Sequence, residues 1–216
     1  MEDSTITGWV ELRALLPQVL KGRSLVWPYP PELVVLDDRV PQGLSAELIA
    51  RKYGISRKQM DEFGVRSHKL AHEATERGYF KSQIMPVEVS LNGNGHTELF
   101  SYDEGIRATA SYEATAALQP AFNPEHSITA GNASQISDGA AAVLLMSLEK
   151  ARELGLKPRA RIRAQAVVGT DPVLMLEGPI PGTAAVLKKA GLDIKSIDRF
   201  EVNEAFASVV LAWEKE

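Results

Sequence analysis

The side chains best suited to direct chemistry are few, and the most reactive type is missing. The 216 residues contain no cysteine, so this chain supplies no thiol nucleophile, disulfide or cysteine-ligated metal site. His68 and His72 stand four residues apart, which places both on one face of a helix, as metal ligands can be. No glutamate follows His68, and no third ligand stands at a telling distance. We therefore interpret both as surface histidines and expect no metal site.

Asn203 is a third candidate, because it directly precedes Glu204, Ala205 and Phe206, where a helix is expected to begin. An asparagine side chain in that position can cap the helix N-terminus. It can also orient a water molecule, since an amide both donates and accepts without changing its charge. Taken alone, the local sequence favours the cap.

A loop rich in small residues can also take part in binding. Residues 129–147 read TAGNASQISDGAAAVLLMS, and their glycines and alanines leave backbone that a ligand can approach closely. Residues 140–146 then form an apolar run that predicts a buried strand. On composition alone, a small-residue turn leading into a sheet explains this segment.

Composition and charge exclude several classes of function. With 44% hydrophobic and 24% charged residues, the chain has the composition of a globular protein with one sizeable core or two small ones. The net charge of -4 and the scattered Lys and Arg residues argue against a nucleic-acid partner. No apolar run approaches the roughly 20 residues that span a bilayer, and the first residues are acidic and polar. We therefore expect no membrane segment and a cytoplasmic location.

Two helices are predicted after residue 41. Ser45 can cap a short helix through Tyr53, which Gly54 would end. Ser56 and Gln59 then form a capping-box pattern that opens a longer helix before Gly78. Apolar and small residues recur along this helix at three- and four-residue spacing and predict one packing face: Met60, Phe63, Ser67, Leu70, Ala71 and Ala74.

Strands and helices alternate along the rest of the chain, which predicts an α/β fold. Residues 84–89 and 97–102 are expected to pair as a hairpin through the Asn-Gly-containing segment 91–95. Further strands are expected at 140–146, 160–169 and 198–202, and helices at 112–118, 148–154, 181–190 and from 204 onward. Residues 9–20 have the pattern of a short helix, and the proline-rich segment 27–31 favours an extended path.

Two motifs relate this chain to a known family. The segment 129–147 closely resembles the part of thiolases that passes the CoA thioester and enters the last strand of their N-terminal domain. Residues 203–207, Asn-Glu-Ala-Phe-Ala, are similar to the NEAFA motif of the same family. The resemblance also includes DEGIR at 103–107 and GPIPGTAAVLKKAG at 178–191, and it covers roughly residues 38–216.

The resemblance implies a thiolase-like layered α/β fold that is incomplete in this chain. It implies a loop domain at 38–136, the last strand and helix of the N-terminal domain at 137–157, and the start of the C-terminal domain at 158–216. Residues 1–37 are left unplaced. The chain is therefore interpreted as a fragment or truncated form of a thiolase.

The resemblance implies an acyltransferase of lipid metabolism and fatty acid β-oxidation. Thiolases exchange acyl units between CoA carriers through an acyl-cysteine, as acetyl-CoA C-acyltransferases or 3-ketoacyl-CoA thiolases. The stretch from 165 to 178 is reminiscent of bacterial thiolases acting on fatty-acyl or steroid side-chain thioesters. Both family cysteines and the Gly-His-Pro histidine are absent, so the isolated chain is expected to be inactive. The alternative is a non-catalytic CoA-binding or interaction module.

The resemblance also assigns binding residues, with CoA as substrate and no separate cofactor. Asn203 would order a catalytic water, and Arg107 would meet the nucleotide end of CoA. The pantetheine path would be lined by Leu118, Phe122, Ala130, Ser134, Met175, Ala205 and Phe206. Ala114 stands where the family has a CoA-contacting hydroxyl. Without the family resemblance, the apolar residues of this set would be interpreted as core residues and Arg107 as a surface arginine.

Partners follow from the same comparison. Thiolases form dimers or tetramers, and the resemblance is compatible with a homo-oligomer or with an association with a complementary thiolase chain. The expected small-molecule partner is acyl-CoA or CoA.

Overall fold

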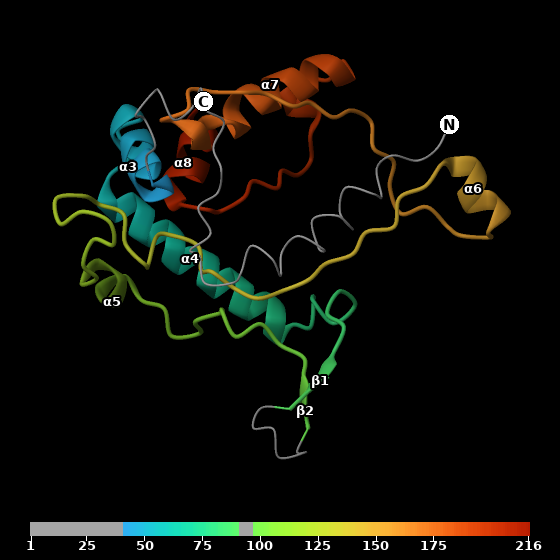
Figure 1. Cartoon of the computed structure of the whole chain (residues 1–216), viewed down its shortest axis with the longest axis horizontal. Helices are drawn as coiled ribbons and strands as arrows, with labels where there is room; N and C mark the ends of the chain where they lie inside the picture. Colours follow the sequence, from blue (N-terminus) through green and yellow to red (C-terminus); the bar gives the residue numbers. More distant parts are fainter. Residues whose placement is uncertain (1–40, 91–96) are drawn as a thin grey trace, which may run out of the picture. The chain divides into compact units, whose positions relative to one another are not determined.

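The computed structural model describes residues 41–90 and 97–216 (Figure 1). The predictions for 9–20, 27–31 and 91–95 lie outside these ranges. The helices are α3 (Gln42–Lys52), α4 (Arg57–Glu76), α5 (Tyr112–Ala116), α6 (Leu148–Glu153), α7 (Pro179–Ala190) and α8 (Ala207–Lys215). Two 3₁₀ helices, η1 (Met175–Glu177) and η2 (Ile194–Ser196), and two strands, β1 (Val87–Val89) and β2 (Glu98–Phe100), complete the described elements.

The start and end of α4 are those that the sequence predicts. The Ser56 side chain accepts a hydrogen bond from the Gln59 backbone N–H, and the Gln59 side chain accepts one from the Ser56 N–H. This capping box satisfies two backbone donors that the first helical turn leaves without partners. Gly78 follows the helix with φ +72°, a left-handed conformation that glycine adopts without steric cost. The result is a helix of 20 residues, the longest in the described part of the chain.

The predicted start of the preceding helix is wrong. α3 begins at Gln42, with Pro41 in the N-cap position, and not after Ser45. The fixed φ of proline suits the first turn of a helix, so Pro41 replaces Ser45 as the entry point. Ser45 lies inside the helix, fully buried, and its hydroxyl has no hydrogen-bond partner among the described residues.

The core forms where α8 packs against α3 and α4. Its fully buried members include Ala46 and Ile49 of α3, Met60 of α4, and Ile128. Burying an aliphatic side chain of this size stabilises the fold by about 1.5–3 kcal/mol. α7 is joined to α8 by a hydrogen bond from the Trp213 indole N–H to Thr183 Oγ1 at 2.8 Å. No helix in the described ranges is both long and apolar enough to cross a membrane.

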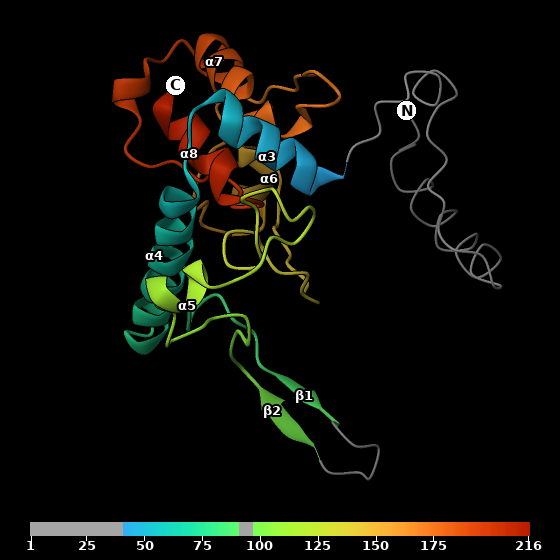
Figure 2. The same cartoon turned by 90° about the vertical axis from the view of Figure 1, so that its left-hand side faces the viewer.

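The predicted β structure is only partly present. β1 and β2 pair antiparallel, with Val87 opposite Phe100 and Val89 opposite Glu98, as the hairpin prediction requires (Figure 2). The strands predicted at 140–146, 160–169 and 198–202 are not formed. These segments have no neighbouring strand within the described residues, and an unpaired strand lacks partners for its backbone N–H and C=O groups.

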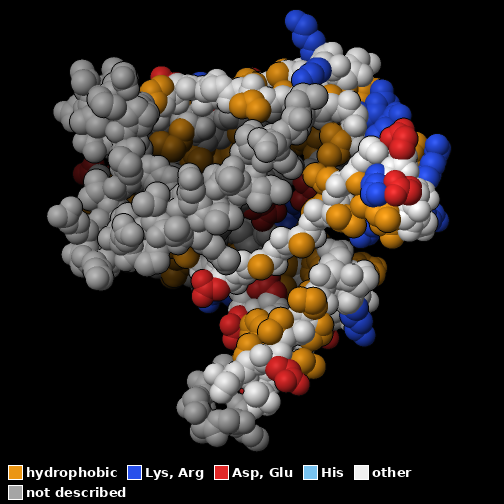
Figure 3. Space-filling view, turned by 45° about the vertical axis from the view of Figure 1, so that its right-hand side comes forward, with side chains coloured by type: hydrophobic (Ala, Val, Ile, Leu, Met, Phe, Trp, Pro, Cys, Tyr) orange, Lys and Arg blue, Asp and Glu red, His pale blue; other side chains and the backbone are white. Residues whose placement is uncertain are grey.

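The segment predicted as a buried strand is exposed instead. Val143, Leu144 and Leu145 are 81%, 75% and 68% accessible. Figure 3 shows hydrophobic side chains on the surface of the molecule. The described structure is therefore mostly helical, and β1 and β2 are its only strands within the described residues.

Candidate functional site

The two motif segments meet in the structure. Ala133 and Phe206 form an isolated antiparallel bridge, although they lie far apart along the chain. The Ser134 backbone N–H donates to the Ala205 carbonyl at 2.9 Å, and the Ala207 N–H donates to the Asn132 carbonyl at 2.9 Å. These hydrogen bonds fix the 129–135 loop against the residues that lead into α8. Four of the predicted site residues, Ala130, Ser134, Ala205 and Phe206, lie on these two segments.

A buried asparagine holds the loop in shape. Asn132 is 3% exposed, and its Oδ1 accepts from the Thr129 N–H at 2.9 Å. Its Nδ2 donates to the Ser127 carbonyl at 3.1 Å and to Asp61 Oδ1 at 2.8 Å. Each polar atom of this amide therefore has a partner, as a buried amide requires.

Asp61 and Arg57, one turn apart on α4, extend this network. The Arg57 Nε donates to Asp61 Oδ2 at 2.6 Å, and Asp61 is fully buried. The Arg57 Nη2 also donates to the carbonyls of Thr115, Ala116 and Leu118 at 3.0, 3.3 and 3.1 Å. Nη2 carries two hydrogens, so the three carbonyls share them, while Nε serves Asp61. The sequence reasoning missed all three network residues, although Arg57 and Asp61 at four-residue spacing are a recognisable helix ion pair.

The loop also depends on small residues, as the sequence indicates. A Cβ added to Gly64 on α4 would overlap the carbonyl oxygen of Gly131. A Cβ added to Gly131 would lie 2.5 Å from Thr115 Cγ2 and 2.9 Å from Leu118 Cδ1. The loop therefore lies in direct contact with α4 on one side and with α5 and its following residues on the other.

A cleft of about 190 Å³ opens beside the loop. Its walls come from α4, from the loop and from the start of α8: Phe63, Gly64, Ser67, His68, Gly131, Asn132, Ala133, Ser134, Gln135, Glu204 and Ala207. Of the residues that the resemblance assigns to CoA, Ser134 lines this cleft. Ser67, His68 and Glu204 are additional polar residues here that the sequence reasoning did not assign to the site.

Among the apolar candidates, Phe122 and Phe206 lie against each other. The rings of Phe122 and Phe206 meet edge to face with centroids 6.3 Å apart. Phe206 is 7% exposed and belongs to the core, whereas Phe122 is 50% exposed. Leu118 is also partly exposed and lies against Gly131. Met175 lies on η1, which packs against α3 and α8, and its side chain is partly exposed.

The capping interpretation of Asn203 is wrong. α8 begins at Ala207 and Phe206 occupies its N-cap position, so Asn203 lies outside the first turn. The residue is exposed, and it precedes Glu204, which lines the cleft. Its role in ordering water stays a prediction.

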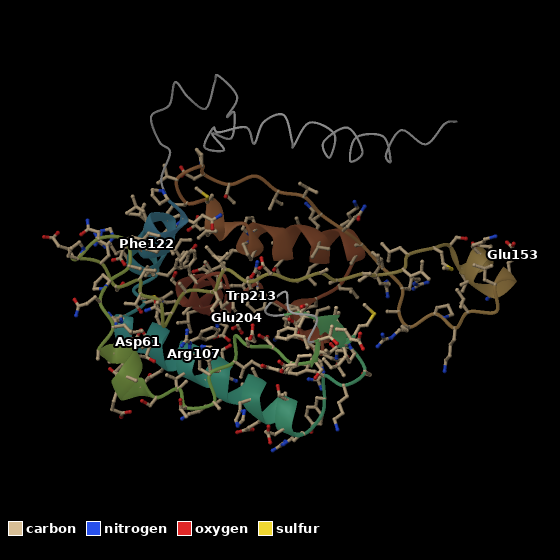
Figure 4. The ribbon with its side chains drawn as sticks, turned by 60° about the horizontal axis from the view of Figure 1, so that its bottom comes forward. Asp61, Arg107, Phe122, Glu153, Glu204 and Trp213 are labelled. Carbon is tan, nitrogen blue, oxygen red and sulfur yellow. The ribbon has the colours of Figure 1, made fainter. Side chains whose placement is uncertain are left out.

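Arg107 is held next to the cleft through its backbone. Its N–H donates to His68 Nδ1 at 3.3 Å, and its side chain is exposed (Figure 4). The same loop is held at Gly105, whose carbonyl accepts from Gln135 Nε2 at 2.6 Å. Burial, and then the Arg107 guanidinium, lower the pKa of His68 below its ordinary value, and Glu204 and Asp103 oppose this only in part. The imidazole is therefore neutral at pH 7, with Nδ1 as the acceptor and Nε2 carrying the proton.

His68 and His72 both lie on α4. His68 uses Nδ1 for the Arg107 N–H. In the ranges that the structure describes, no three His, Asp or Glu side chains are grouped as metal ligands would be.

The two segments through which the sequence resembles thiolases are therefore joined in the structure. The sequence profile of the thiolase N-terminal domain matches residues 29–149, and that of the thiolase C-terminal domain matches residues 156–216. This chain belongs to the thiolase family.

Within the family the chain is a homologue of the 3-ketoacyl-CoA thiolases. It is 51% identical over 166 residues to a 3-ketoacyl-CoA thiolase of Marinobacter nauticus, and 52% identical over 170 residues to one of Salmonella typhimurium. These alignments cover 76% and 78% of this chain but 42% and 44% of the relatives. The chain therefore spans less than half the length of the curated relatives that it matches.

Solved structures agree with this assignment. A crystal structure of the Bacillus anthracis acetyl-CoA acetyltransferase superposes with a TM-score of 0.79 at 40% identity, covering 90% of this chain and 50% of that one. The human mitochondrial 3-ketoacyl-CoA thiolase superposes with a TM-score of 0.78 at 35% identity, covering 91% and 50%. The fold is thus thiolase-like, with parts of both thiolase domains present.

Proposed function

We propose that this chain forms the CoA-binding side of a thiolase-type acyltransferase site. The observation that carries the proposal is the antiparallel contact of Ala133 with Phe206, flanked by the Ser134–Ala205 hydrogen bond. It places the small-residue loop and the NEAFA segment side by side. The names of the relatives, 3-ketoacyl-CoA thiolase and acetyl-CoA acetyltransferase, support CoA thioesters as the ligand class.

The exposed side chains suit the phosphates of CoA and the amide and methylene groups of its pantetheine arm. Arg107 presents an exposed guanidinium to the phosphates of the nucleotide end. Ser134 presents an exposed hydroxyl that can hydrogen-bond an amide of pantetheine. The partly exposed Leu118, Phe122 and Met175 offer apolar surface to its methylene groups. Ala130, Ala205 and the largely buried Phe206 complete the proposed path.

This chain does not supply the covalent chemistry. Thiolysis of a 3-ketoacyl thioester proceeds through an acyl group on a cysteine thiolate, and these 216 residues contain no cysteine. We propose that the nucleophile and the bases come from other parts of the assembled protein, and that Asn203 orders a water at the thioester oxygen. We assign residues 38–136 to the loop domain, 137–157 to the N-terminal domain and 158–216 to the C-terminal domain.

Enzyme kinetics and binding together test this proposal. The purified chain is incubated with acetoacetyl-CoA and CoA, and loss of the 3-ketoacyl thioester is followed by absorbance. We expect CoA binding in calorimetry without measurable thiolysis. Thiolysis by the homogeneous chain would overturn the assignment of the nucleophile to other parts, and an absence of CoA binding would overturn the proposed site.

A second candidate function is a non-catalytic interaction module, in which the chain pairs with a complementary thiolase chain or with itself. The exposed apolar segment at 143–145 favours it, because an extended apolar segment offers backbone donors and acceptors to a partner strand. Replacing Val143 and Leu145 by lysine should then abolish concentration-dependent association in sedimentation velocity. A wild-type chain that sediments as a monomer at every concentration would exclude this candidate as a self-association.

A further inference from the structure

Ser67 and His68 are neighbours on α4, and each binds a different segment that carries predicted site residues. Ser67 Oγ donates to Glu204 Oε2 at 2.6 Å. His68 Nδ1 accepts from the backbone N–H of Arg107 at 3.3 Å. Ser67, His68 and Glu204 all line the cleft beside the small-residue loop. Figure 4 shows Arg107 and Glu204 beside α4.

Glu204 is the link between Ser67 and the NEAFA segment. It stands between Asn203 and Ala205, and the Ala205 carbonyl accepts the Ser134 N–H. Holding the Glu204 side chain therefore restrains the peptide groups on both sides of it. A hydrogen bond to a carboxylate is short and about twice as strong as one between neutral groups, so this contact can restrain an exposed segment.

α4, which carries both residues, is itself held in place by several contacts. Its capping box fixes the N-terminus, and the Arg57–Asp61–Asn132 network ties its first two turns to the loop. Gly64, one turn before His68, lies directly against Gly131. Positions 64, 67 and 68 fall on one helix face, so a single face meets the loop, the NEAFA segment and the Arg107 segment.

We propose that Ser67 and His68 are positioning residues that set the spacing between Arg107 and the 203–206 segment, and so between the sites for the nucleotide and thioester ends of CoA. The inference rests on the proposed CoA-binding function. Each residue holds one of the two protein segments. Ser67 holds the segment proposed to bind the thioester end of CoA, and His68 holds the segment proposed to bind the nucleotide end.

The His68 contact requires a neutral imidazole. A protonated ring carries hydrogen on both nitrogens, so it cannot accept the Arg107 N–H. The charged groups that face His68 are Arg107, Glu204 and Asp103, of which Arg107 opposes protonation and the two acids favour it. CoA affinity in the wild type is therefore expected to fall as the pH drops well below 6.5, and to do so less in a His68→Asn variant.

The test combines amide hydrogen exchange without ligand and calorimetric titration with CoA and with free pantetheine. The variants are S67A, S67T, H68A and H68N, where threonine and asparagine retain the donor and the acceptor. Lys69→Ala, an exposed neighbour on α4 outside the cleft, is the matched control. Melting temperatures are recorded for each variant, so that comparisons use folded protein.

S67A should speed exchange at the Ser134 and Ala207 amides and weaken both CoA and pantetheine by about tenfold, which is the size expected for one lost charged hydrogen bond. H68A should speed exchange at the Arg107 amide and weaken CoA by about fivefold without affecting pantetheine, which lacks the nucleotide. S67T and H68N should restore most of each loss, and Lys69→Ala should behave as wild type.

Two results separate this inference from the function on which it rests. If the wild type binds CoA and neither S67A nor H68A changes exchange or affinity, the positioning roles are wrong and the proposed function stands. If the wild type does not bind CoA, the proposed function fails, and the role of this pair in CoA spacing fails with it.

Discussion

Asn132 Nδ2 donates to Asp61 Oδ1 at 2.8 Å, and both side chains are buried. This contact joins the small-residue loop to the first turns of α4, 71 residues earlier in the chain. Arg57 forms an ion pair with the same carboxylate and also donates a hydrogen bond to the carbonyl of Leu118, which follows α5. The shape of the candidate CoA-binding loop therefore depends on a buried polar network rather than on the loop sequence alone.

Asp61→Ala should destabilise the chain strongly. It removes one of the two acceptors of the buried Asn132 amide and leaves the Arg57 guanidinium without its counter-ion, and such losses cost roughly 3 kcal/mol. Urea unfolding measures the change. Glu62→Ala, on the exposed side of the same helix turn, is the control and should stay within about 0.5 kcal/mol of wild type. Equal effects of the two variants would show that the network does not stabilise the fold.

Gly64→Ala should also destabilise the chain, although alanine is normally preferred over glycine inside a helix. Alanine favours a helix over glycine by about 1 kcal/mol, but here the new methyl group overlaps the Gly131 carbonyl oxygen. Gly182 on α7 is the matched control, because a Cβ there meets Val168 at an ordinary 3.7 Å. Thermal melts should show a lower midpoint for Gly64→Ala and a slightly higher one for Gly182→Ala. An increase for both would mean that α4 and the loop are not in close contact.

Asn203→Ala should leave stability nearly unchanged, within about 0.5 kcal/mol, because α8 begins beyond it at Ala207. Ser56→Ala removes a real capping box and should cost about 1 kcal/mol under the same conditions. Chemical denaturation of the two variants side by side measures the difference. A loss of 1 kcal/mol or more, about the worth of a cap, in Asn203→Ala would restore the capping interpretation.

Glu47 should make the fold sensitive to acid. Burial acts to raise its pKa, but hydrogen bonds from the Ser127 hydroxyl and N–H and the nearby Arg51 outweigh it, so the pKa lies below its ordinary value of 4.5. The ionised form is therefore favoured in the folded state. The ionised Glu47 carboxylate therefore stabilises the fold fully above pH 4.5. This stabilisation is lost as the pH falls through the lowered pKa of Glu47 in the folded state.

Melting temperatures of the wild type and Glu47→Gln between about pH 7 and pH 3.5 test this linkage. The wild type should be the more stable at neutral pH, and the difference should shrink in acid. A difference that is constant across the whole range would contradict the assigned role of Glu47.

Local features were predictable because neighbouring residues encode them. The Ser56–Gln59 capping box and the end of α4 at Gly78 follow from backbone and side-chain chemistry within a few positions. The start of α3 was missed because Ser45 has the chemistry of a cap, while Pro41 was already suited to begin the helix. The choice between the two depends on burial of α3 against α8, which is a tertiary effect.

Strands at 140–146 and 198–202 could not be decided from their own sequences. An apolar run is compatible with a strand, but a strand forms only where another one pairs with it. The β1–β2 hairpin formed because its partner lies close in sequence. The predicted site residues on 130–134 and 205–206 were brought together, whereas Asp61, Ser67 and Glu204 were missed because their contacts cross long sequence separations.

The most direct test of CoA binding by this chain is calorimetric titration with CoA and with free pantetheine, using the purified wild type, Arg107→Ala and Ser134→Ala. If the chain forms the CoA-binding side of the site, the wild type binds both ligands. Arg107→Ala then weakens only CoA, and Ser134→Ala weakens both by about fivefold each, the worth of one hydrogen bond. A wild type that binds neither ligand, or variants that bind both as the wild type does, would contradict it.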